Sequence, residues 1–120
     1  MAEHQITGKA IIRVDGEEWS TEDGAKLNPG GVTREAKVGG GKVRGFAEKT
    51  KAPELECAVY HTRDTDLTAI NAINDATVVY ESDTGDRYVL RNAFVTEQGE
   101  LDAENNTINV KFSAISCERI

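Results

Sequence analysis

Residues 32–46 read VTREAKVGGGKVRGF. Val32 to Val38 and Lys42 to Phe46 alternate charged and small apolar residues on either side of the tip Gly39, Gly40 and Gly41. That pattern predicts a β-hairpin with a flexible tip. We expect its arms to offer little apolar surface of their own, and an isolated two-stranded hairpin is only marginally stable in water. The hairpin therefore needs something to lie against, and a neighbouring copy of the chain would serve.

The hairpin lies in the most basic part of an acidic chain. Seven of the 14 basic residues fall between Lys26 and Lys51, with only Glu35 and Glu48 among them, so this stretch carries +5 while the whole chain carries −7. A basic arm on an acidic body is electrostatically complementary to other copies of the same chain. The candidate inter-subunit residues are Lys26, Arg34, Lys37, Lys42, Arg44, Lys49 and Lys51.

The arm is expected to span about residues 21–51. Its first part, residues 21–31, is polar and punctuated by Asp23-Gly24, Asn28-Pro29 and Gly30-Gly31. Clusters of this kind are typical of loops. We therefore expect a long loop that leads into the hairpin.

The rest of the chain predicts mainly strands. They are expected at residues 5–14, 17–20, 54–62, 77–81, 87–96 and 107–115, with Asp15-Gly16 forming a tight turn after the first. Two of them alternate cleanly and predict a buried face, made of Leu55, Cys57 and Val59 in one and of Ile108, Val110 and Phe112 in the other.

One helix is expected, at about residues 66–74. Leu67, Ile70 and Ile73 recur at a spacing of three and form one apolar stripe. Asp64 or Thr65 is the expected N-cap. The fold class is α+β, mainly β: a small antiparallel β-barrel or sandwich with one flanking helix and an extended basic hairpin.

Length and composition set further limits. At 120 residues, with 38% hydrophobic and 29% charged residues, the chain fits a single domain, residues 1–120, with one core. No apolar run approaches the roughly 20 residues that a membrane-spanning helix needs, so no membrane insertion is expected. The N-terminal MAEHQITGKA lacks the pattern of a signal peptide, which favours a protein that is made and kept in a cytoplasm. In that reducing compartment Cys57 and Cys117 are expected to be two buried thiols.

Motifs that could carry chemistry fit structural roles better. Asp83-Thr84-Gly85 matches the triplet of retroviral-type aspartic proteases, but its polar flanks predict an exposed hairpin turn. Gly41-Lys42 lacks the flanking residues of a phosphate-binding loop. His4 and His61 lack metal-ligand spacing, and Cys57 and His61 share a strand face without touching. We therefore expect no catalytic residues, no metal and no cofactor.

Several stretches together resemble the tail tube proteins of Mu-like contractile-tailed phages. They are IIRVDGEEW (residues 11–19), NPGGVTREAKVGGGKVRGFAEKTKAPELECAV (28–59), DLTAINAINDATVVYE (66–81), RYVLRNAFV (87–95) and GELDAENNTINVKFSAISCERI (99–120). Each motif is modest, but their order and spacing run along nearly the whole chain.

The resemblance implies a structural virion protein without enzymatic activity. Six copies would form a ring, and rings would stack into a hollow tube inside a contractile sheath, through which DNA passes without specific binding. The partners implied are other copies of the chain and the tail sheath, tape measure, baseplate and tail terminator proteins. The place implied is the phage tail, assembled in the bacterial host cytoplasm.

Three other functions remain open from the residues alone. One is a nucleic-acid-binding β-barrel, although such barrels interleave aromatic with basic residues and Phe46 is the only aromatic residue between Lys26 and Lys51. Another is a small hydrolase or protease that uses Asp83 or Cys57. The last is a monomeric β domain whose charged hairpin is merely solvated.

Overall fold

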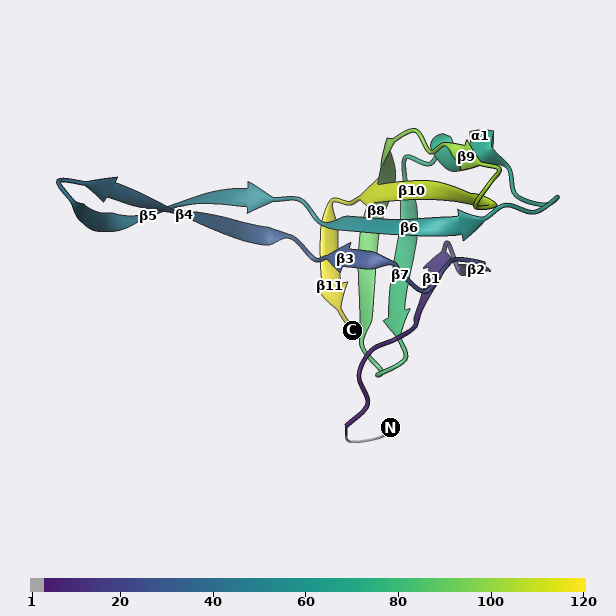
Figure 1. The fold of residues 1–120 in the computed structure, drawn as a ribbon, viewed down its shortest axis with the longest axis horizontal. Helices are drawn as coiled ribbons and strands as arrows, with labels where there is room; N and C mark the ends of the chain where they lie inside the picture. The colour runs from purple at the N-terminus through teal and green to yellow at the C-terminus, as the bar shows by residue number, and fades with distance from the viewer. Residues whose placement is uncertain (1–3) are drawn as a thin grey trace.

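The computed structural model describes residues 4–120, so the first three residues of the N-terminal MAEHQITGKA lie outside the described part. The strands are β1 (Ala10–Val14), β2 (Glu17–Trp19), β3 (Lys26–Asn28), β4 (Gly31–Gly39), β5 (Lys42–Lys51), β6 (Glu54–Tyr60), β7 (Ala76–Ser82), β8 (Arg87–Glu97), β9 (Leu101–Asp102), β10 (Thr107–Ser113) and β11 (Ser116–Arg119), and the helix is α1 (Leu67–Asn71). Figure 1 shows a β-rich body from which the β4–β5 hairpin projects.

The body is a strongly bent antiparallel sheet. Its hydrogen-bonded order is β2-β1-β7-β8-β10-β6-β3, with β11 paired to β8 and β9 to β10. Strands β7, β8 and β11 run across β6 and β10 in Figure 1. The bent sheet thus has two parts, one made of β1, β2, β7 and β11 and the other of β3, β6, β9 and β10. The long strand β8 belongs to both parts, because its first half pairs with β7 and β11 and its second half with β10. Asn92, in the left-handed region at φ 53°, marks the bend between the two halves.

The core lies between these two parts of the sheet. Both faces expected from the alternation are buried, in β6 and in β10. Ile12, Val78 and Leu90 from the crossing strands complete the core, and each is fully buried. Burial of apolar surface in this layer supplies the main stabilisation of the body.

The sequence was compatible with either a β-barrel or a β-sandwich. The structure shows that the barrel prediction was wrong. In the described part of the chain the strand order begins at β2 and ends at β3, with no pairing between those two strands, so the sheet is not a closed barrel. The outer edges of β2 and β3 therefore remain open on the body.

The predicted helix begins as expected but is shorter. Asp66, rather than Asp64 or Thr65, is the N-cap, since its carboxylate accepts hydrogen bonds from the backbone N–H groups of Thr68 and Ala69. The helix ends at Asn71, before Ile73, whose carbonyl accepts a hydrogen bond from the N–H of Val95 in β8 at 3.1 Å. Ile73 still packs against the core beyond the helix end. The apolar stripe was therefore predicted correctly, and the end of the helix was not.

Other boundaries also differ from the expectation. The first strand begins at Ala10 rather than Gln5, because the preceding residues contact the β7–β8 turn instead of a strand: the Gln5 side chain donates to the carbonyl of Asp83, and the two hydroxyls of Thr7 and Thr84 are hydrogen-bonded. The expected loop at residues 21–31 contains β3, which pairs with β6. Strand β11 was not predicted.

Candidate inter-subunit interface

The β4–β5 hairpin was correctly predicted and is longer than expected. It turns at Gly40 and Gly41, whose φ angles of 61° and 75° give the left-handed pair that a type I′ turn requires. Gly39 and Lys42 form the last strand pair, so the expected tip of three glycines is a turn of two. The Arg44 guanidinium folds back over this turn, where its Nε donates to the carbonyl of Gly39 at 2.9 Å.

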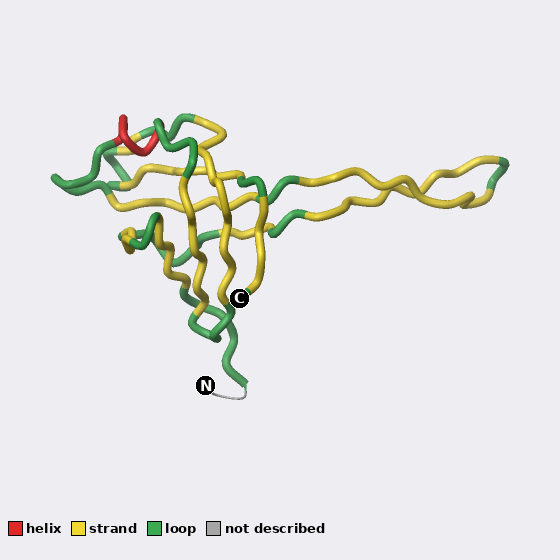
Figure 2. Tube along the Cα trace, turned by 180° about the vertical axis from the view of Figure 1, so that it is seen from behind, coloured by secondary structure: helices red, strands yellow, loops and turns green. Residues whose placement is uncertain are grey.

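The hairpin has no core of its own. No residue between Gly31 and Lys51 is buried. Figures 1 and 2 both show the two strands crossing as a twisted ribbon beyond the body. The molecule therefore measures 61 × 38 × 28 Å, with a radius of gyration of 17.3 Å. A compact chain of this length has a radius of gyration of about 14 Å, so the ribbon is a genuine extension.

Strand pairing gives the ribbon an apolar face that the sequence pattern did not predict. Val32, Ala36 and Val38 of β4 lie opposite Thr50, Phe46 and Val43 of β5. Directly opposed residues share a face of the ribbon. Val38, Val43 and Phe46 expose 69%, 70% and 63% of their surface. The expectation of little apolar surface was therefore wrong, because a bulge at Arg44 shifts the pairing and brings Val43 onto this face.

The opposite face of the ribbon is basic. Pairing places Lys37, Lys42, Lys49 and Lys51 there, together with Glu35. Glu35 contacts Lys37 at 3.4 Å. Exposed ion pairs of this kind contribute little to stability.

The remaining arm residues take two other positions. Arg34 lies on the apolar face, where its guanidinium contacts Glu48 at 3.1 Å and stacks 5.7 Å from the centre of the Phe46 ring. Lys26 lies outside the hairpin, in β3 opposite Glu56 of β6.

The base of the hairpin is narrow. Gly30 has φ 76°, and a Cβ atom there would lie 2.7 Å from the carbonyl oxygen of Lys51 and from the nitrogen of Pro53. Both strands of the ribbon therefore leave the body through a gap that only glycine fits at this position.

The groups considered for chemistry lie apart from one another. Asp83, Thr84 and Gly85 form the turn between β7 and β8, as predicted. Cys57 is buried, and burial, with a smaller contribution from the Glu56 carboxylate, raises the pKa of its thiol from 9.0 to about 12. Cys117 was expected to be buried and is only half-buried. Within residues 4–120 no group of three or more His, Cys, Asp or Glu side chains lies close enough to hold a metal ion. No helix in that part is long and apolar enough to cross a membrane.

Known proteins resemble this chain along nearly its whole length. A family model described as phage tail tube protein matches residues 3–119. The chain is 40% identical to the Mu-like prophage FluMu tail tube protein of Haemophilus influenzae over 97% of each chain. It is 35% identical to the tail tube protein of Escherichia phage Mu over 85% of this chain and 86% of that one.

Solved structures with the same fold have much lower sequence identity. Hcp1 from Flavobacterium johnsoniae matches with a TM-score of 0.63 at 12% identity, over 92% of this chain and 94% of that one. A chain from the sheath/tube terminator of the PVC extracellular contractile injection system matches with a TM-score of 0.67 at 15% identity, over 100% and 99%. A chain from the tube-terminating cap of the anti-feeding prophage matches with a TM-score of 0.63 at 16% identity, over 100% and 93%. The mainly β fold is thus the one that Hcp1 has, and the sequence matches show that the chain belongs to the phage tail tube protein family, a family of structural virion proteins rather than enzymes.

Proposed function

We propose that copies of this chain close into rings, six to a ring, and that the rings stack into the hollow tube of a contractile phage tail. The observation that carries the proposal is the β4–β5 hairpin, a ribbon of 21 residues without one buried side chain. A ribbon of this kind is at best marginally stable in water, whereas contact with another copy would cover its apolar face.

The two ends of the sheet support closure into a ring. A ring requires a heterologous contact, in which one patch of the molecule meets a different patch of the next copy. Strands β2 and β3, at opposite ends of the strand order, present two such different edges. Pairing these edges across a boundary would also remove exposed strands that favour uncontrolled aggregation.

Charge supports passage of DNA through the tube. The hairpin, residues 31–51, carries six basic and two acidic residues in a chain of net charge −7. Contact between this arm and a neighbouring copy would neutralise basic charge and leave acidic residues in excess. An acidic lumen repels phosphate groups, so DNA would slide from the capsid to the host without binding.

The same assembly defines the other partners. We propose that the tube contacts a sheath on its outside, a tape measure protein in its lumen, and baseplate and terminator proteins at its two ends. The fold shared with chains of a sheath/tube terminator and of a tube-terminating cap supports end partners built like the tube subunit itself. Assembly would take place in the host cytoplasm, and the product would be part of the virion tail.

Neutralising the distal hairpin tests this function. The triple variant Lys37→Gln, Lys42→Gln, Arg44→Gln should fail to form tubes in negative-stain images, while its thermal unfolding remains close to that of the unchanged chain. A control variant, Lys9→Gln, Arg63→Gln, removes two positive charges from the body and should leave tubes intact. Normal tubes from the triple variant would refute the role of the basic arm. A monomer at every concentration of the unchanged chain would contradict the assembly itself.

A further inference from the structure

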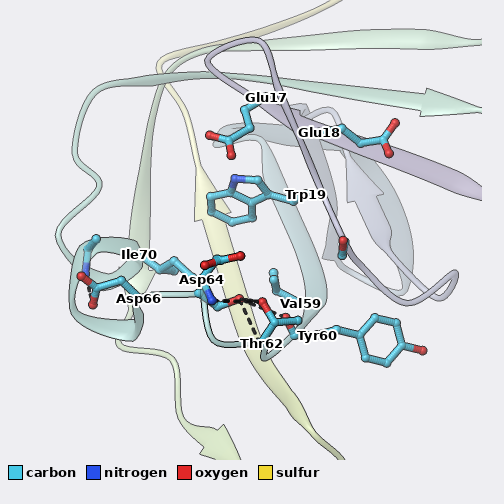
Figure 3. Close-up of a pocket in the computed structure, with 12 residues that line it drawn as sticks. Glu17, Glu18, Trp19, Val59, Tyr60, Thr62, Asp64, Asp66 and Ile70 are labelled. Carbon is cyan, nitrogen blue, oxygen red and sulfur yellow. Dashed lines mark hydrogen bonds between the residues drawn. The ribbon is translucent and has the colours of Figure 1, made fainter.

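A groove lies on the body between β2, α1 and the loop that precedes α1. Its volume is about 430 Å³. Figure 3 shows the side chains of Glu17, Glu18, Asp64 and Asp66 around the indole of Trp19. The indole is anchored below by the core, because its ring lies 5.9 Å from that of Phe112.

The groove combines an apolar floor with an acidic rim. Trp19, Val59 and Ile70 contribute the apolar surface. Among the rim carboxylates Asp66 is engaged as the cap of α1, and Glu18 lies 3.8 Å from Arg13.

Two rim carboxylates remain for another partner. Glu17 and Asp64 are exposed, and neither is in an ion pair among the described residues. No basic residue of that part of the chain lines the groove. The local charge is therefore negative, which favours a cationic partner with some apolar surface.

The distal half of the hairpin has the complementary composition. Val43 and Phe46 form its exposed apolar face, and Lys37 and Lys42 form its basic face. Lys37 and Lys42 lie on the face opposite the apolar one, but a two-stranded ribbon is narrow, and their long, flexible side chains can reach around its edges to charges at the rim of a groove. The same ribbon can thus cover the floor and contact the rim.

The hairpin cannot reach the groove of its own chain. Figures 1 and 2 both place the hairpin tip at one end of the long axis and α1 and β2 at the other. Contact between tip and groove therefore joins two copies head to tail. This is the heterologous arrangement that a closed ring or an extended tube requires.

We propose that the acidic groove around Trp19 is the docking site for the distal hairpin of a second copy of this chain. The inference rests on the proposed function and names the two surfaces that meet in it. Apolar contact with Trp19 supplies affinity, and the carboxylates of Glu17 and Asp64 select the basic ribbon over other surfaces.

Two charge-reversed variants test the contact by mixing. One carries Glu17→Lys and Asp64→Lys in the groove, and the other carries Lys37→Glu and Lys42→Glu in the hairpin. Each alone opposes like charges across the contact, so sedimentable polymer should fall at least about tenfold. An equimolar mixture places opposite charges together at every contact and should restore polymer. Glu100→Lys, Glu104→Lys, which reverses two exposed carboxylates that do not line the groove, should polymerise normally.

The outcomes separate this inference from the proposed function. Circular dichroism checks that each variant is folded. Docking is supported if both variants lose sedimentable polymer when alone and regain it when they are mixed. Normal polymer from the groove variant, or loss in both variants without recovery on mixing, overturns docking while the tube function stands. Failure of the unchanged chain to polymerise under the same conditions overturns both.

Discussion

Phe46→Ala separates assembly from folding. Phe46 exposes 63% of its surface on the apolar face of the hairpin. Burial of a whole phenylalanine side chain is worth about 1.5–3 kcal/mol, so covering the exposed part in an assembly contributes about 1–2 kcal/mol per copy. Its truncation should therefore raise the critical concentration for polymerisation about 5- to 30-fold.

The free energy of unfolding of the isolated chain should change little in Phe46→Ala. In the folded monomer Phe46 contacts the guanidinium of Arg34, a cation–π interaction worth about 0.5–1 kcal/mol at an exposed site. Phe112→Ala is the matched control, because Phe112 is fully buried in the core. That substitution should lower the free energy of unfolding by about 3–5 kcal/mol.

Sedimentation across a concentration series gives the critical concentration, and urea denaturation of non-assembled protein gives the free energy of unfolding. A critical concentration for Phe46→Ala within about twofold of the unchanged chain would refute the apolar contact, since it corresponds to less than about 0.5 kcal/mol. A loss of unfolding free energy as large as that of Phe112→Ala would refute the claim that the hairpin is independent of the core.

Three further predictions concern the hairpin base, the helix and the buried thiol. Gly30→Ala should reduce tube formation, because its Cβ atom would collide with backbone at the hairpin base. The control Gly24→Ala, where a Cβ atom meets nothing within 4 Å, should form tubes normally. Equal yields of tubes from the two variants in electron micrographs would refute this prediction. Asp66→Ala should lower the free energy of unfolding by about 1 kcal/mol in urea, because α1 loses its N-cap, and no change would contradict that role. The Cys57 thiol keeps its proton up to about pH 12 in the folded chain, whereas in the unfolded chain it loses the proton above about pH 9. The free energy of unfolding should therefore fall between these two pH values, by up to about 1.4 kcal/mol per pH unit. Cys57→Ala should reduce that slope in urea denaturation across this pH range.

The sequence predicted best those elements whose pattern reflects their own burial. Strands β6 and β10 alternate because one face of each packs in the core, so their first residues and their buried residues were predicted correctly, while each ends two residues earlier than expected. Strands β3 and β11 have only three and four residues, and each contributes a single half-buried apolar side chain, Leu27 and Cys117 respectively. Their existence depends on pairing with β6 and β8, which a local pattern does not reveal.

The two surfaces of the proposed contact, the hairpin and the groove, show the same limit. The alternation in β4 and β5 was visible, but the shared apolar face depends on the bulge at Arg44, which sets the pairing of Val38 with Val43. The groove joins Glu17 with Asp64 across 47 positions of sequence, and only the fold brings them together. Closure of the sheet could not be predicted either, since it depends on whether the edges β2 and β3 meet.

Cryo-electron microscopy of tubes formed by the purified chain tests the central claim most directly. We predict a hollow tube of stacked six-membered rings in which each β4–β5 hairpin contacts a neighbouring copy and its apolar face is covered. Tubes in which this hairpin points into solvent and touches no other copy would contradict the account.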